Sequence, residues 1–191
     1  MNWNCFAALG AAFAVAVPAC TTTKSGGVTF DSASQTTIVT GKETTVSPLA
    51  GPVRTLFLKA EISPGETGLY LVVLYLSVDG WLSADRVVDT DGNTLRGYRG
   101  ADQTFDIQFS HVTEEVYYIP LTRRYLEAHR HSGINLRLTG AKGTVAANQP
   151  ASFVQDFLTN LHATQTRLAG EVSVKKLVAT RSEPGPTPAG Q

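Results

Sequence analysis

The chain has 191 residues, and its sixteen acidic residues balance its sixteen basic ones at a formal net charge of zero. This length suits one domain that folds without cross-links, and a neutral chain without a dense lysine and arginine stripe disfavours nucleic acid as a partner. The only two cysteines are Cys5 and Cys20, so the body of the protein is predicted to contain no disulfide and no thiolate metal site.

The first predicted element is an export signal over residues 1–19. Residues 6–19 form an unbroken run of small and apolar side chains, and a polar stretch over residues 21–27 follows directly after Cys20. The run is shorter than the roughly 20 residues that a helix needs to span a bilayer. An apolar run that ends on small residues and then turns polar is typical of a cleaved signal, not of part of a fold.

The sequence Val17-Pro18-Ala19-Cys20 resembles the lipobox of bacterial lipoproteins. This resemblance covers residues 1–20 and implies that Cys20 is diacylated, becomes the new N-terminus and anchors the protein to a membrane. The threonine after Cys20 implies the outer membrane of a two-membrane cell envelope, with the domain facing the periplasm. Two other interpretations remain open: a secretory signal cut near Ala19 without lipidation, and an uncleaved anchor or core helix.

Beyond the signal, we expect a flexible tether over residues 20–27, a single β-rich domain over 28–180 and a disordered tail over 181–191. Threonine, serine and glycine follow Cys20, as suits a spacer between a lipid and a domain. Residues 28–46 are rich in Thr and Ser and predict one or two weak edge strands. The end of the chain is rich in proline and glycine, a composition that does not pack into a core.

Strands dominate the predicted domain. Residues 69–76 are apolar on both faces and rich in Tyr and Val, which predicts a central strand covered on both sides. Residues 87–95 contain the pair Asp91-Gly92, which predicts a hairpin with a tight turn. Further strands are expected over 53–62, 104–109, 116–119 and 134–138, with a candidate last strand over 171–179.

Two helices complete the prediction. Thr122 is expected to cap a short helix over residues 123–129. A longer helix follows, because five apolar residues repeat at the spacing of one helix face and Ser152 with Gln155 forms a capping box; the five are Phe153, Val154, Phe157, Leu158 and Leu161. The fold class is therefore α+β, a mainly antiparallel β-sheet or sandwich with one long amphipathic C-terminal helix and one short helix.

The candidate ligand-binding residues are Arg96, Arg99, His129 and His131. Guanidinium groups suit carboxylate and phosphate ligands, so this set predicts an anion site if the fold brings its members together. The two histidines also suit the end of the short helix, where positive charge favours the negative end of the helix dipole. No second ligand pair accompanies them, and we expect no metal and no cofactor.

Two further patterns have a structural interpretation that we favour. Asp89, Asp91 and Asn93 alternate like calcium ligands, but Gly92 stands between the second and third ligands, so a hairpin turn explains the spacing better. Five aromatic residues either line a ligand groove or pack in the sheet, and packing is the more common role of aromatics on strands; they are Tyr70, Tyr75, Trp81, Tyr117 and Tyr118.

The chain contains no local catalytic signature: no G-x-S-x-G elbow, no H-E-x-x-H and no phosphate-binding glycine loop. We expect an envelope lipoprotein whose non-enzymatic domain binds an envelope protein or a glycan. One alternative is an exported hydrolase or carbohydrate-active domain with carboxylates in an aromatic groove, drawn from Asp85, Asp102, Asp106 and Glu115. Another is a module that docks by strand addition along residues 28–46.

Overall fold

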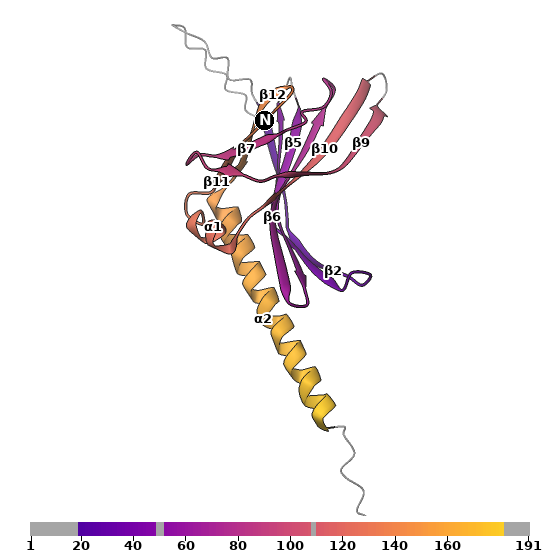
Figure 1. The fold of residues 1–191 in the computed structure, drawn as a ribbon, viewed down its shortest axis with the longest axis vertical. Helices are drawn as coiled ribbons and strands as arrows, with labels where there is room; N and C mark the ends of the chain where they lie inside the picture. The colour runs from indigo at the N-terminus through magenta and orange to yellow at the C-terminus, as the bar shows by residue number, and fades with distance from the viewer. Residues whose placement is uncertain (1–18, 49–51, 108–109, 182–191) are drawn as a thin grey trace, which may run out of the picture.

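The computed structural model describes residues 19–48, 52–107 and 110–181, which form two antiparallel β-sheets and two helices (Figure 1). The larger sheet contains β1 (Ala19–Lys24), β2 (Gly27–Asp31), β3 (Thr36–Thr40), β4 (Glu43–Pro48), β5 (Val53–Ser63), β6 (Glu66–Ser77), β9 (Tyr98–Ile107) and β10 (Ser110–Pro120). The smaller sheet contains β7 (Arg86–Asp89), β8 (Thr94–Leu95), β11 (Ile134–Gly140) and β12 (Gly143–Gln149). The helices are α1 (Arg123–Ala128) and α2 (Ala151–Arg181), and the α+β prediction is confirmed.

The larger sheet has the order β1-β4-β5-β6-β10-β9, and β3 and β2 continue from β5 beside β4 and β1. Strands β3 and β4 pair with the two ends of β5, and β2 and β1 pair with β3 and β4. The N-terminal segment is therefore one long bent hairpin laid along β5. It bends where Gly26 passes close to Gly41. Only glycine fits at position 26, because a side-chain carbon there would lie 2.2 Å from the carbonyl oxygen of Thr40.

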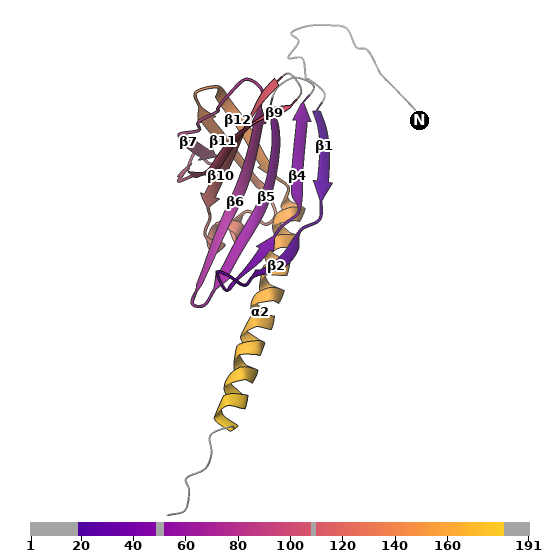
Figure 2. The ribbon, with the colours of Figure 1, turned by 90° about the vertical axis from the view of Figure 1, so that its right-hand side faces the viewer.

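The core lies between the two sheets, with α1 and α2 closing its end. The inner face of β5 and β6 supplies Leu56, Leu58, Leu71 and Val73, and the smaller sheet supplies residues such as Leu136, all at most 1% exposed. Strand β6 lies between β5 and β10, as predicted for a central strand. Only one of its faces is covered by a second layer, and Figure 2 looks onto the other face.

Helix α2 packs its first turns against the larger sheet and then extends beyond both sheets (Figure 1). The predicted apolar face is confirmed where Val154, Phe157 and Leu161 are buried in the core. The predicted last strand over 171–179 is wrong, because these residues continue α2. No proline interrupts the chain between Ala151 and Arg181, and a helix that has started gains one hydrogen bond with each added residue.

The start of α2 also differs from the prediction. The helix begins at Ala151, and the N–H groups of Phe153 and Val154 donate to the carbonyl oxygen of Pro150 at 3.0 and 3.2 Å. Ser152 therefore lies inside the first turn and is not the N-cap. The Gln155 side chain does not complete a capping box either, since its amide donates to the carbonyl oxygen of Arg130 at 3.0 Å.

The prediction of a flexible tether over residues 20–27 is also corrected by the structure. Residues 19–24 form β1, paired with β4, and β2 starts at Gly27, so only Ser25 and Gly26 lie between strands. Threonines of the two strands face each other at Thr22–Thr45 and Thr23–Thr44. Threonine favours strands, and opposed threonine pairs stabilise them, which explains why a polar segment is paired here.

The remaining predictions at the two ends of the chain lie outside the described residues. These are the export signal up to residue 18 and the tail over 182–191. Within the described residues, neither helix combines the length and the hydropathy that crossing a membrane would require.

Candidate functional site: an open strand edge beside helix α2

Strand β2 is the exposed edge of the bent hairpin. It pairs with β3 on one side only, and all five of its residues are exposed. Strand β3 is instead paired on both sides, by β2 and by β5. Of the predicted edge over residues 28–46, β2 is therefore the part that leaves backbone N–H and C=O groups open along a whole strand.

The side chains of Val28 and Phe30 lie on the core face of this strand. Val28 stands opposite Val39, and Phe30 stands opposite Thr37; both partners are buried, at 0% and 5% exposure. Val28 and Phe30 themselves are 45% and 61% exposed. The apolar face of the sheet thus continues past the region that α2 covers.

A groove of about 920 Å³ lies between β2 and α2. Its sheet side includes Val28, Phe30 and Ile62, and its helix side includes Arg167 and Leu168. An apolar floor beside an unpaired strand edge is the arrangement that can accept an added strand together with its side chains.

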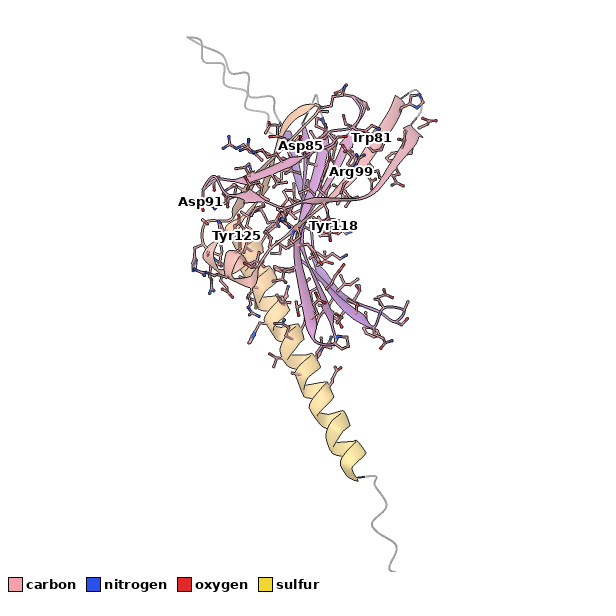
Figure 3. All side chains as sticks on the ribbon, viewed as in Figure 1. Trp81, Asp85, Asp91, Arg99, Tyr118 and Tyr125 are labelled. Carbon is pink, nitrogen blue, oxygen red and sulfur yellow. The ribbon has the colours of Figure 1, made fainter. Side chains whose placement is uncertain are left out.

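The four predicted ligand residues do not form one wall. Among the described residues, no hydrogen bond or ion pair joins any two of Arg96, Arg99, His129 and His131. In Figure 3, Arg99 lies near Trp81 on one side of the β-structure, whereas Asp91 and Tyr125, the neighbours of His129, lie on the other.

Arg99 lies at the solvent-exposed rim of a polar cluster around the buried Glu115, at the base of the 80–84 loop. Its Nε lies 2.6 Å from Asp102 and 3.5 Å from Glu115, and its guanidinium lies 4.9 Å from the Trp81 ring. Glu115 is 0% exposed and accepts hydrogen bonds from the backbone N–H groups of Leu82 and Ser83 at 2.5 and 2.9 Å. This cluster fixes the loop to β10.

Tyr117 completes that cluster. Burial raises the pKa of its phenol, so the hydroxyl stays protonated and donates to Glu115 at 2.7 Å while it accepts from the N–H of Ala84 at 2.9 Å. Glu115 therefore has a positioning role and no surface that a substrate could reach. Of the other three carboxylates of the hydrolase alternative, Asp102 contacts Arg99, Asp106 contacts His111, and Asp85 is exposed beside the smaller sheet.

His129 has a different set of neighbours. Its Nε2 lies 3.8 Å from the carboxylate of Asp91, and its ring stacks on Tyr125 with 4.1 Å between the centroids. The carboxylate of Asp89 completes a group whose ligand atoms all lie within 4.8 Å of one another. The fold thus joins two patterns that the sequence separates by forty positions, the aspartates of the β7–β8 turn and the histidine at the end of α1.

The aromatic residues divide between core and surface. Tyr75 and Tyr117 are buried in the core, at 4% and 2% exposure. Tyr70 and Tyr118 cluster with Tyr98 on the open face of the larger sheet, where the Tyr98 and Tyr118 rings stack at 5.4 Å. The predicted packing role thus holds for the buried pair, and no single aromatic groove contains all of these residues.

Phe30 is not among the candidate residues predicted from the sequence. The available signal was the alternation of Val28 and Phe30 within a threonine- and glycine-rich segment, which places two large apolar side chains on one face of a predicted edge strand. Searches against protein-family models, curated proteins and solved structures found no match for this chain.

Proposed function

We propose that this protein is a lipid-anchored envelope protein whose domain binds an extended segment of a partner protein along β2. The observation that carries the proposal is the free edge of β2, with Val28 and Phe30 exposed at a groove whose lining is partly apolar and partly polar. In strand addition, main-chain hydrogen bonds supply affinity, and alternate side chains of the ligand enter pockets that supply specificity.

The sequence of β2 supports this use of the edge. Proteins commonly protect exposed edge strands with lysine, proline or a bulge, because an open edge pairs with other chains. Strand β2 has the sequence Gly-Val-Thr-Phe-Asp, which contains no lysine and no proline and has a single charge at its end. Covering a Val or Phe side chain fully contributes about 1.5–3 kcal/mol, so a partner strand that covers Val28 and Phe30 gains substantially.

The anchoring half of the proposal rests on the lipobox resemblance at Cys20. In Figure 2, β1 begins at the end of the larger sheet that is remote from the C-terminal end of α2. With Cys20 acylated, that end of the sheet would be held at the membrane. The groove and the projecting part of α2 would then point away from the bilayer, toward a partner in the envelope.

The binding half is tested by photo-crosslinking in cells. A photoreactive phenylalanine analogue replaces Phe30 in one strain and Val78 in another; Val78 is equally exposed, at 63%, but lies outside β2. We expect a discrete crosslinked protein from position 30 and none of that mass from position 78. The purified partner should then bind the wild type and Val78→Asp equally, and Phe30→Asp at least about tenfold more weakly.

Two results would contradict this binding site. One is a crosslinking pattern that is the same at positions 30 and 78. The other is full affinity of the Phe30→Asp variant for the partner, because a charge placed on the floor of the groove must oppose an apolar side chain that enters it.

The anchoring half has its own experiment. Wild type and Cys20→Ser are expressed in a bacterium with and without globomycin, and the N-terminus is analysed by mass spectrometry. We expect globomycin to block processing of the wild type, an acylated Cys20 in the mature protein, and membrane release of the Cys20→Ser variant. A processed protein with an unmodified Cys20 would remove the lipid anchor from the proposal and leave the binding half standing.

A further inference from the structure

The carboxylates of Asp89 and Asp91 and the imidazole of His129 form a second, independent site. Asp89 ends β7, Asp91 lies in the following turn, and His129 caps the C-terminus of α1. One ligand atom from each lies within 4.8 Å of the other two. We propose that this group binds a divalent transition-metal ion of the zinc type.

The hydrogen bonding of His129 prepares it to be a ligand. Its Nδ1 lies 2.8 Å from the carbonyl oxygen of Tyr125, and a carbonyl oxygen only accepts, so Nδ1 carries the proton. In the neutral imidazole the lone pair is therefore on Nε2, the nitrogen that faces Asp91. Metal-binding histidines typically have their second nitrogen fixed by a carbonyl or carboxylate acceptor in this way.

The position of the imidazole is also restrained. Its ring stacks on Tyr125, and the side chain is only 14% exposed. A ligand that is already held in place loses little conformational entropy when an ion binds.

The charge of the group is not neutralised by the protein. Asp89 is 1% exposed, and the groups that donate hydrogen bonds to its carboxylate, on Asp91, Asn93 and Tyr125, are uncharged backbone N–H, amide and hydroxyl groups. Among the described residues, no lysine or arginine forms an ion pair with Asp89 or Asp91. Two carboxylates close to the Nε2 of one imidazole are an environment that a divalent cation stabilises.

The types of donor decide the class of metal. An imidazole nitrogen with carboxylate oxygens suits zinc, cobalt, nickel or copper, whereas calcium and magnesium prefer oxygen donors alone. Zinc bonds to nitrogen and oxygen are about 2.0–2.2 Å long, so the donors must approach each other by about 1 Å. Asp91 supplies this movement, because its side chain is 67% exposed and already faces His129.

Asp89 keeps its role in the turn when the ion is bound. Its Oδ1 accepts from the N–H groups of Asp91 and Asn93 at 3.0 and 2.8 Å, and these bonds close the turn. Its Oδ2 accepts from the Asn93 side-chain amide at 3.0 Å and from the Tyr125 hydroxyl at 3.3 Å, the longest hydrogen bond of this carboxylate. Oδ2 is therefore the oxygen that turns to the metal, with water completing the coordination.

The test uses the tag-free mature protein and metal ions alone. Zn²⁺ binding is measured by isothermal titration calorimetry, and Co²⁺ binding by its visible absorption. We expect one saturable site in the wild type, with His129→Ala and Asp91→Asn weakening it about tenfold or more. His131→Ala is the matched control, because His131 is exposed and lies outside the group, and its affinity should equal that of the wild type.

Three outcomes would overturn the site: no saturable binding to the wild type, unchanged affinity in both ligand variants, or loss of binding in His131→Ala. Circular dichroism shows whether His129→Ala remains folded. Asp91→Asn changes an exposed side chain and keeps the test decisive if the histidine variant does not fold.

Discussion

Two phenylalanines at the same face of the larger sheet, one from α2 and one from β2, have opposite environments. Phe157 of α2 packs against the sheet at 1% exposure, whereas Phe30 of β2 is 61% exposed. Gly41 permits the close approach of Phe157, since a side-chain carbon at Gly41 would lie 3.3 Å from its ring. The apolar face of this sheet is therefore wider than the helix that covers it.

The largest loss in the free energy of unfolding is expected when Phe157 is truncated, on the part of the larger sheet that α2 covers. For Phe157→Ala we expect a loss of about 3–5 kcal/mol, because the change removes a large buried side chain and leaves a cavity between α2 and β5. Urea denaturation followed by circular dichroism measures this loss. A loss below about 1 kcal/mol would mean that α2 does not close the core and that Phe157 and Phe30 do not differ in their contribution to stability.

A polar substitution at the buried Glu115 of β10 should lower the free energy of unfolding by less than Phe157→Ala does. Leu82 and Ser83 donate to different oxygens of Glu115, so Glu115→Gln places an amide donor opposite one of these two N–H groups. We expect a loss of about 1.5–3 kcal/mol in the same denaturation experiment.

Asp106→Asn is the matched control for Glu115→Gln. Asp106 is also a carboxylate of the larger sheet, but its ion pair with His111 is exposed, at 72% and 84% of the two side chains, and its loss should change stability little. Equal effects of the two substitutions would show that the cluster at Glu115 does not support the 80–84 loop.

Short-range signals in the sequence predicted much of this arrangement. Gly92 adopts a φ of 85° in the turn between β7 and β8, as the Asp91-Gly92 pair indicates. Thr122 caps α1 by accepting from the N–H of Tyr125 at 3.1 Å. The apolar run over 69–76 lies within β6. Each of these features is determined by residues that are close in the sequence.

The missed features depend on contacts between distant segments. Strand β1 looks like a spacer until β4 is placed beside it, and β12 follows a turn in a segment with few large apolar side chains. The approach of His129 to Asp91 depends on how α1 packs beside the β7–β8 turn. For the same reason, Phe30 could be assigned to a strand face from the sequence, but its exposure depends on where α2 crosses the sheet.

The smallest effect on stability is expected at the uncovered phenylalanine. Phe30→Ser removes a side chain that is already 61% exposed, so the free energy of unfolding should change by less than about 0.5 kcal/mol. The measurement is the same urea denaturation, made beside Phe157→Ala. A loss above about 1 kcal/mol would show that Phe30 is part of the folded core, and a partner strand could then not be gaining its burial. Unchanged stability together with lost partner binding separates the two halves of the face: one maintains the fold, and the other is available for an added strand.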